Sequence, residues 1–199
     1  MICRKSDSES ARIAADFLRH GKIVILPTDT VYGFSGIVDG RHYSYHTDEK
    51  IRQIKDRAAS SAESEQKSFI QLISKPDDIK KYTRVLIPDE LFAKWPCAIT
   101  IVVYTFAADG NFEKTAFRCP GDEWLRNVIS FCGAPIYSTS VNKSGKPFLN
   151  TVSEIKREFG RAVDLFVEDG DKKNGVPSTI VEIEKDGSLN ILRQGAVTI

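Results

Sequence analysis

The junction between a short apolar strand and the polar turn after it constrains this chain most. Residues 22–26 read as the strand, and Pro27 ends it because proline has no amide proton to donate to a neighbouring strand. Thr28, Asp29 and Thr30 follow at once and place two hydroxyls and a carboxylate at the strand end. In chains that alternate strands and helices, ligands usually bind at strand ends. A structured loop, in which these side chains hydrogen-bond their own backbone, is the alternative that this segment leaves open.

Length, composition and charge exclude several classes of protein. A chain of 199 residues with 41% hydrophobic residues can bury a real core, and we expect one domain over residues 1–199, with no appended C-terminal domain. Lys and Arg number 28 against 27 Asp and Glu. This balance argues against a strongly electrostatic nucleic-acid binder, although not against a local basic cleft. No apolar run approaches the roughly 18 residues of a membrane span.

The N-terminus and the cysteines predict a cytoplasmic protein with reduced thiols. Residues 1–7 lack the apolar core of a signal peptide. The four cysteines form no C-x-x-C pair and no framework of a small secreted fold. His42 and His46 have the spacing H-x-x-x-H without an acidic or thiol partner, so we expect no metal site built by the protein itself.

Hydrophobic periodicity and turn residues predict alternating helices and strands. Ser6 and Glu9 read as a capping box before a helix that Gly21 ends. Asp186-Gly187 indicates a β-hairpin near the end of the chain. Further helices are expected over residues 47–57, 88–95, 122–131 and 152–159, and further strands over residues 69–73, 98–106, 115–119, 135–139, 165–168, 178–183 and 189–192. This order predicts an α/β fold with a mixed parallel and antiparallel sheet and flanking helices.

Basic residues gather at the end of the 47–57 helix. Lys55 and Arg57 lie two apart, a small and polar stretch covers residues 58–66, and Lys67 precedes the next strand. Cations at a helix C-terminus commonly complement the helix dipole, which is one explanation. Two cations before a flexible loop also suit a polyphosphate around which the loop closes.

Polar residues follow later strands as well. Residues 138–145, Ser-Thr-Ser-Val-Asn-Lys-Ser-Gly, could form a turn or could cradle phosphate oxygens with hydroxyls and backbone amides. Pro177-Ser178-Thr179 and Arg193-Gln194-Gly195 form another polar pair of segments. Arg118 lies within an apolar strand, where a buried cation needs a partner such as a carboxylate or phosphate. A position facing solvent is the alternative for Arg118.

Several catalytic motifs are absent from the sequence. It contains no G-x-x-x-x-G-K-[ST], no G-x-G-x-x-G after a strand, no G-x-S-x-G and no plausible nucleophilic serine or cysteine paired with a histidine. An enzyme with these clusters would therefore act by positioning and charge stabilisation rather than through a covalent intermediate.

Taken in order, the polar segments resemble the YrdC family, the threonylcarbamoyl-AMP synthases. They run from residue 22 to residue 195, nearly the whole chain, and their common order is far more specific than any one of them. The matching segments are Pro27-Thr28-Asp29-Thr30-Val31-Tyr32-Gly33, Lys55-x-Arg57, Trp95-Pro96-x-x-x-Thr100, Phe117-Arg118-x-Pro120, Ser138-Thr139-Ser140-x-Asn142-x-Ser144-Gly145, Pro177-Ser178-Thr179 and Arg193-x-Gly195.

The resemblance implies a fold and an activity. The fold is a twisted mixed α/β sheet around a large open cavity lined by basic residues. The activity is that of a nucleotidyltransferase, which condenses L-threonine, bicarbonate and ATP, with Mg²⁺ carried by ATP, to threonylcarbamoyl-AMP and pyrophosphate. The product would feed N6-threonylcarbamoyladenosine formation on tRNA through a separate transferase protein. Whether this chain contacts tRNA directly is left open.

The resemblance also implies roles for single residues. The threonine substrate is expected at Thr28, Thr30, Arg118, Ser138 and Ser178, with Arg118 on its carboxylate. ATP is expected at Lys55, Arg57, Lys67, Thr100, Ser140, Asn142, Ser144 and Arg193. Lys55 and Arg57 are the expected catalytic cations, because they would stabilise charge on the leaving pyrophosphate.

Departures from the family pattern leave alternatives. Cys97-Ala98 stands where the family commonly has Gly-Pro, and the stretch from Arg57 to Lys67 is longer and more polar than usual. The alternative functions are a YrdC-like RNA-binding protein and a paralogue without synthase activity. The intact Lys-x-Arg and Ser-x-Asn-x-Ser-Gly segments favour the synthase. A carbamoyl-transfer role as in hydrogenase maturation would require zinc-binding cysteines, which this sequence lacks.

Overall fold

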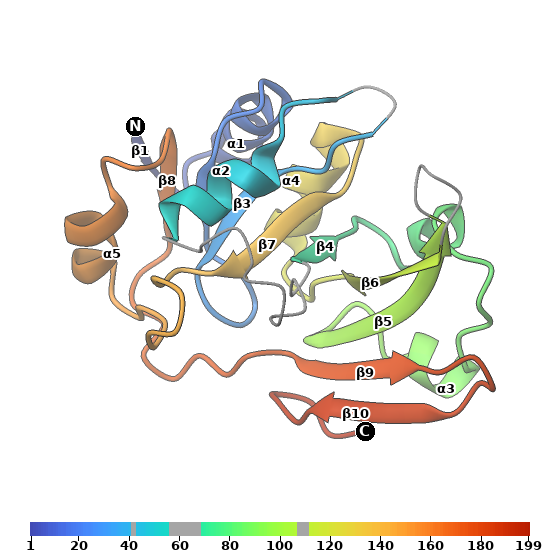
Figure 1. The fold of residues 1–199 in the computed structure, drawn as a ribbon. Helices are drawn as coiled ribbons and strands as arrows, with labels where there is room; N and C mark the ends of the chain where they lie inside the picture. Colours follow the sequence, from blue (N-terminus) through green and yellow to red (C-terminus); the bar gives the residue numbers. More distant parts are fainter. Residues whose placement is uncertain (41–42, 56–68, 107–111) are drawn as a thin grey trace.

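The computed structural model describes residues 1–40, 43–55, 69–106 and 112–199, and it shows one open sheet with helices packed on both faces (Figure 1). The helices are α1 (Ser10–Arg19), α2 (Thr47–Ile54), the 3₁₀ helix η1 (Pro76–Lys81), α3 (Asp89–Phe92), α4 (Glu123–Cys132) and α5 (Val152–Phe159). The strands are β1 (Ile2–Arg4), β2 (Val24–Leu26), β3 (Gly33–Ile37), β4 (Ile70–Leu72), β5 (Ile99–Phe106), β6 (Phe112–Arg118), β7 (Ile136–Ser140), β8 (Leu165–Glu168), β9 (Thr179–Ile183) and β10 (Leu189–Arg193).

The sheet is mixed, as the sequence predicts. Its ten strands lie in the order β1-β8-β2-β3-β7-β4-β6-β5-β9-β10. The pairs β1/β8, β2/β8, β4/β6 and β5/β9 are parallel. The pairs β2/β3, β3/β7, β4/β7, β5/β6 and β9/β10 are antiparallel. The expected hairpin at Asp186-Gly187 joins β9 to β10, and Gly187 has the positive φ of +84° that such a turn favours.

The central strands are buried on both faces because their side chains alternate between two cores. Val24 and Leu26 of β2 pack into a core with α1 and α4, which includes Leu18 and Leu125. The intervening Ile25 packs into the opposite core, together with residues of α2 and α5 such as Ile51 and Ile155. Because β2 is covered by helices on both faces, all of its side chains are apolar and the sequence shows a continuous apolar run there.

The other half of the sheet is covered on one face only, and this leaves room for a site. Ile99, Ile101 and Val103 of β5 pack with η1 and α3 into a third core. Thr100 alternates with them and therefore points to the opposite face. There Ile180 of β9 lines a cavity.

The start of α1 corrects the sequence analysis. The helix begins at Ser10, and Glu9 occupies the N-cap position without a side-chain capping bond, so the Ser6–Glu9 capping box is wrong. Asp7 instead accepts a hydrogen bond from the backbone amide of Arg4, and Ser10 Oγ donates to the carbonyl of Lys5. These bonds close the turn between β1 and α1.

Three elements were not predicted: β1, β3 and η1. Gly33 fits either a turn or a close approach of the backbone, and the structure shows the close approach, at the start of β3. A side chain on Gly33 would meet Ser138 Oγ of β7 at 2.8 Å, and one on Gly36 would meet Thr47 of α2 at 2.6 Å. The glycines of β3 therefore allow close packing on both sides rather than a reversal of the chain.

Other predicted boundaries agree to within about three residues, and α5 and β8 agree fully. The expected 47–57 helix ends earlier, at Ile54, with Lys55 as its C-cap. Residues 56–57, the 58–66 stretch and Lys67 lie outside the described part of the chain. Within the described residues, no helix is long and apolar enough to cross a membrane.

Candidate functional site

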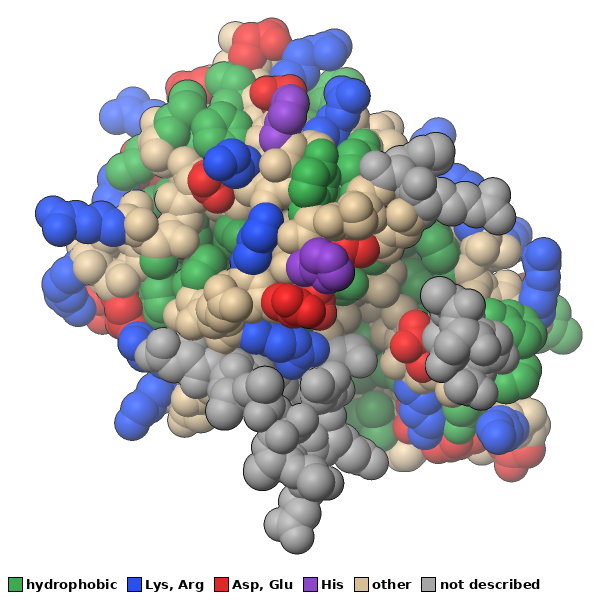
Figure 2. All heavy atoms as spheres, turned by 45° about the horizontal axis from the view of Figure 1, so that its top comes forward, with side chains coloured by type: hydrophobic (Ala, Val, Ile, Leu, Met, Phe, Trp, Pro, Cys, Tyr) green, Lys and Arg blue, Asp and Glu red, His purple; other side chains and the backbone are tan. Residues whose placement is uncertain are grey.

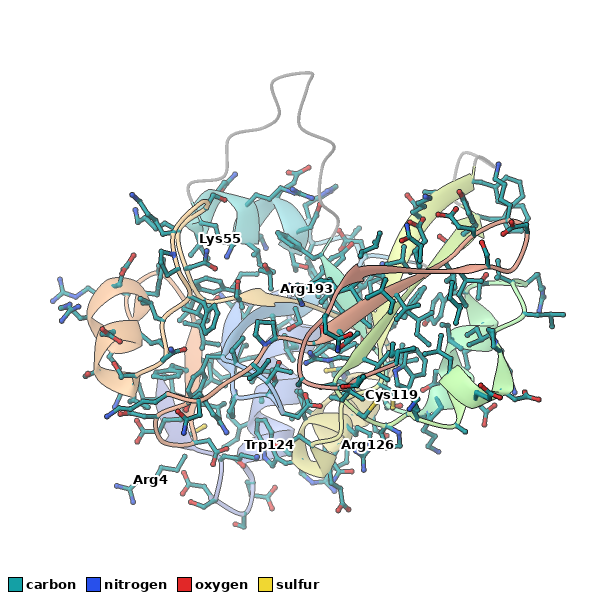
Figure 3. All side chains as sticks on the ribbon, turned by 90° about the horizontal axis from the view of Figure 1, so that it is seen from below. Arg4, Lys55, Cys119, Trp124, Arg126 and Arg193 are labelled. Carbon is teal, nitrogen blue, oxygen red and sulfur yellow. The ribbon has the colours of Figure 1, made fainter. Side chains whose placement is uncertain are left out.

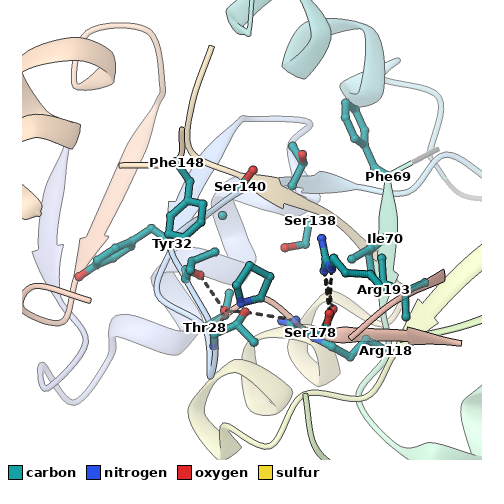
Figure 4. A pocket seen from close by; sticks show the side chains of 16 residues that line it. Thr28, Tyr32, Phe69, Ile70, Arg118, Ser138, Ser140, Phe148, Ser178 and Arg193 are labelled. Carbon is teal, nitrogen blue, oxygen red and sulfur yellow. Dashed lines mark hydrogen bonds between the residues drawn. The ribbon is translucent and has the colours of Figure 1, made fainter. Parts of the chain in front are cut away.

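A cavity of about 290 Å³ opens on the half-covered face of the sheet, where the ends of several strands meet (Figure 4). The turn after β2 contributes Thr28 and Thr30 to its lining, and β6 contributes Arg118. The remaining predicted residues that line it are Ser138 and Ser140 of β7, Ser178 before β9, and Arg193 of β10. Residues separated by most of the chain's length thus share one site, as the resemblance implies.

A directed chain of hydroxyl groups organises the turn after β2. Thr28 Oγ1 donates to the carbonyl of Val31 at 2.7 Å, which uses its only proton. The 2.8 Å bond between Thr28 and Thr30 must therefore be donated by Thr30. Arg118 Nη1 in turn donates to Thr30 Oγ1 at 3.2 Å. Arg118, two hydroxyls and a carbonyl thus form one continuous hydrogen-bonded chain. Thr28 bonds the backbone of its own turn, as the structured-loop alternative expects, while Thr30 also bonds the distant Arg118.

Arg118 is buried, which excludes the solvent-facing alternative. Its relative exposure is 3%, and its guanidinium forms an ion pair with Asp29, with Nη2 3.2 Å from Oδ1. Burial lowers the pKa of Arg118, and the Asp29 carboxylate opposes that shift. Asp29 Oδ2 also accepts a hydrogen bond from the amide of Gly121 at 2.8 Å. Asp29 therefore supports the arginine from behind, a role that the sequence analysis did not predict.

Arg193 reaches the same cavity from β10. Its Nε and Nη2 donate to the carbonyl of Ser178 at 3.1 and 2.8 Å, and Nη2 also lies 3.3 Å from Ser178 Oγ. Burial lowers the pKa of Arg193, and the positive charge of Arg118 lowers it further. Thr100 lies one layer deeper, fully buried, and hydrogen-bonds Ser178 Oγ at 2.8 Å. Thr100 thus orients Ser178 rather than lining the cavity.

Lys55 holds the segment after β7 together. Its ammonium donates to the carbonyls of Ser140 and Asn142, at 2.5 and 2.9 Å, and to Asn142 Oδ1 at 2.9 Å. Asn142 Oδ1 also accepts from Ser140 Oγ at 2.7 Å. Asn142 Nδ2 donates to the carbonyls of Lys143 and Lys146. These contacts fix the conformation of the loop that follows Ser140. Figure 3, which views the molecule from below the orientation of Figure 1, labels Lys55 and Arg193.

The remaining predicted site residues differ in their position relative to the cavity. Ser138 is buried and lines the cavity, whereas Ser144 is exposed and its amide donates to the carbonyl of Lys55. Arg57 and Lys67 lie outside the described residues. Phe148 and Tyr32 line the cavity without having been singled out. Phe148 follows the polar 138–145 segment closely, and that proximity is the signal that could have found it.

The cysteines near the site are protonated packing residues. Burial raises the pKa of the half-buried Cys97 thiol and raises that of Cys119 to about 12. Neither therefore carries the thiolate that a nucleophile needs. Within the described residues, no group of three His, Cys, Asp or Glu side chains could hold a metal ion.

Charged side chains of both signs lie on the face of the molecule shown in Figure 2. On the face shown in Figure 2, Lys and Arg side chains are interspersed with Asp and Glu rather than gathered in one basic stripe. This mixture agrees with the net charge of +1.

The chain is similar to known proteins over most of its length. The Sua5/YciO/YrdC family model, described as "Telomere recombination", matches residues 16–195. A threonylcarbamoyl-AMP synthase from Pyrococcus abyssi is 27% identical over 197 residues, which cover 94% of this chain and 54% of that protein. A threonylcarbamoyl-AMP synthase from Pseudoalteromonas translucida is 26% identical over 185 residues, covering 88% of this chain and 94% of that protein. The chain thus spans about half the length of the P. abyssi relative.

A solved structure supports the same relationship. The crystal structure of P. abyssi Sua5 complexed with L-threonine matches with a TM-score of 0.80 and 26% identity, over 98% of this chain and 57% of that chain. The resemblance drawn from the ordered polar segments is therefore confirmed. Because the family model covers the strands and turns that build the cavity, this protein belongs to the Sua5/YciO/YrdC family.

Proposed function

We propose that this protein is a threonylcarbamoyl-AMP synthase that uses L-threonine, bicarbonate and ATP. The observation that carries the proposal is the presence of two arginines, Arg118 and Arg193, in one hydroxyl-lined cavity of a chain whose relatives bear that name. In addition to burial, the positive charge of Arg118 lowers the pKa of Arg193, so the two guanidinium groups repel each other. An anion bound between them would offset this repulsion. Carboxylates and phosphates are the anions that a planar guanidinium binds best.

The buried end of the cavity suits the amino-acid substrate. Arg118 would bind the threonine carboxylate. Thr30 accepts a hydrogen bond from the arginine, Thr28 in turn accepts one from Thr30, and both threonines would border the substrate. Ser138 Oγ forms no hydrogen bond to another described residue and lines the cavity, so it can bond to a substrate. Ser178, fixed by Thr100 and Arg193, would contact threonine from the opposite wall. The L-threonine complex of the P. abyssi relative supports this assignment.

ATP would lie toward Arg193 and the loop after β7. Arg193 would contact a phosphate of ATP, and the Ser140 hydroxyl at the cavity wall would form a hydrogen bond with the nucleotide. The bonds of Lys55 and Asn142 support a role in shaping this loop, and Ser144 lies on its exposed side. Lys55 as a phosphate ligand stays a prediction, as do Arg57 and Lys67 outside the described residues.

The chemistry requires positioning more than acid–base catalysis. The neutral amine of threonine forms a C–N bond with the carbon of bicarbonate, and water leaves, to give a carbamate. A carbamate oxygen then attacks the α-phosphorus of ATP, and the bond from that phosphorus to the bridging oxygen breaks to release pyrophosphate. Arginine and lysine side chains would stabilise the charge of the leaving group. Mg²⁺ would arrive bound to the ATP phosphates.

The product has a defined chemical use. Threonylcarbamoyl-AMP is a mixed anhydride, so a separate transferase would pass its threonylcarbamoyl group to adenosine in tRNA. A cytoplasmic location and a transient contact with that transferase or with tRNA accompany this proposal.

Pyrophosphate release tests the proposal directly. The protein is incubated with ATP, Mg²⁺ and bicarbonate, with and without L-threonine, and with L-serine as a competing substrate. Release that requires threonine and falls with serine is expected. Bound ATP without threonine-dependent release would overturn the proposal and favour a paralogue without synthase activity. Threonine-independent, salt-sensitive tRNA binding would then favour the RNA-binding alternative.

A further inference from the structure

We infer that Asp29 is a positioning residue, which fixes the Arg118 guanidinium for the carboxylate of the amino-acid substrate. This inference rests on the proposed function, because that proposal places the threonine carboxylate at Arg118. It adds a residue to which neither the family pattern nor the cavity lining assigns a role.

Asp29 connects the turn after β2 with a distant stretch of the chain, residues 118–121. Its Oδ1 lies 3.2 Å from Arg118 Nη2 at the end of β6, and its Oδ2 accepts from the amide of Gly121 at 2.8 Å. The turn after β2 is thereby joined both to the end of β6 and to the segment that leads into α4.

Asp29 lies where it can act on the substrate only through Arg118. Thr28, Thr30 and Arg118 line the cavity, whereas Asp29 does not. A carboxylate facing the cavity would repel a substrate carboxylate. Behind the arginine, the same charge compensates a buried guanidinium and leaves its other edge for the ligand.

Two fixed contacts determine the plane of the guanidinium. Nη1 donates to Thr30 Oγ1 at 3.2 Å, and Nη2 faces Asp29 at 3.2 Å. Arg118 Nε and Asp29 Oδ1 are buried, and neither has a well-aligned hydrogen bond to a described residue. Loss of the Asp29 charge would therefore leave Arg118 with a single described partner and with the like charge of Arg193 nearby.

A double-mutant cycle tests the inference. Threonine and ATP KM values are measured by pyrophosphate release for the wild type, Asp29→Asn, Arg118→Lys and the double variant. Asp29→Asn is expected to raise the threonine KM by about tenfold, equivalent to about 1.4 kcal/mol, and to leave the ATP KM within about twofold. In the Arg118→Lys background, Asp29→Asn should add little, because the guanidinium that it positions is gone.

Asp78→Asn is the matched control. Asp78 also pairs with a cation, Lys81 at 2.7 Å, and accepts a backbone amide, that of Lys75 at 3.1 Å. Its side-chain exposure of 21% is close to the 15% of Asp29, but it lies on η1 and does not line the cavity. The threonine KM of the Asp78→Asn variant should equal that of the wild type.

The outcomes separate the inference from the proposed function. Additive losses in the double variant would show that Asp29 acts independently of Arg118, and equal increases in both KM values would show a general structural role. Either result overturns the inference while the wild type remains active. A wild type without threonine-dependent release would instead contradict the proposed function.

Discussion

Lys55 Nζ donates to the side-chain oxygen of Asn142 at 2.9 Å and thereby ties the end of α2 to the loop after β7. It also donates to the backbone carbonyls of Ser140 and Asn142. The lysine is only 3% exposed, so its charge is stabilised by these oxygens rather than by water. A cation that the sequence suggests as a phosphate ligand is thus also a structural centre of the site.

Replacement of Lys55 by methionine should destabilise the protein. The change removes a buried cation and its bonds to two carbonyls and to Asn142 Oδ1, which keeps only the Ser140 hydroxyl as a donor among the described residues, so we expect the free energy of unfolding to fall by about 2–4 kcal/mol. Urea denaturation measures this loss. Lys94→Met, at an exposed position after α3 where the lysine forms no side-chain hydrogen bond or ion pair with a described residue, is the control and should change stability by no more than about 0.5 kcal/mol. Equal effects of the two variants would contradict the structural role.

Arg118→Ala should weaken the use of threonine far more than that of ATP. Charge-assisted hydrogen bonds contribute about 1.5–3 kcal/mol, so the threonine KM should rise by roughly 10–150-fold. The ATP KM, measured in the same pyrophosphate assay, should change by less than about threefold. A comparable loss for both substrates would argue against the carboxylate assignment.

Thr30→Val should interrupt the chain of hydroxyl groups at its centre. Arg118 Nη1 loses its acceptor and Thr28 Oγ1 loses a donor, so we expect about 1–3 kcal/mol of destabilisation together with a raised threonine KM. Thr115→Val is the control, because Thr115 is equally buried and shares a 2.7 Å hydroxyl pair with Thr105 away from the cavity. Thr115→Val should lower stability but leave the threonine KM unchanged, and a rise in that KM would refute this explanation.

The contribution of the Tyr32 phenol to stability should disappear at alkaline pH. Burial raises the pKa of Tyr32 to about 12 from the ordinary value of 10.0. Above pH 10 the unfolded state ionises first and binds fewer protons than the folded state, so stability falls as the pH rises toward 12. The phenol donates to the carbonyl of Gly170 and accepts from the amide of Asp169, and Tyr32→Phe removes both bonds.

The variant Tyr32→Phe should therefore be less stable than the wild type at pH 8. The difference in urea midpoint between the two should shrink from pH 10 to pH 11.5. A difference that stays constant or widens across this range would show that the phenol is not held neutral in the fold.

Much of the fold could be predicted from local patterns. The apolar pattern of β5, the periodicity of α5 and the Asp186-Gly187 turn each depend on neighbouring residues. The structure confirms all three predictions. The missed strand β3 depends on distant residues, because its glycines allow β7 and α2 to pack closely against it. The late start of α1 instead follows from the bonds that Asp7 and Ser10 form with the nearby backbone of Arg4 and Lys5.

The candidate site divides in the same way. The residue types that line the cavity can be read from the sequence, because the polar turns at strand ends appear there as ordered segments between Thr28 and Arg193. The use of each residue depends on the tertiary structure. It placed Asp29 behind Arg118, turned Lys55 and Asn142 toward each other, and buried Thr100 beneath Ser178. Hydrogen bonds act over about 3 Å, so they depend on which distant strands the sheet brings together, and no local pattern records that distance.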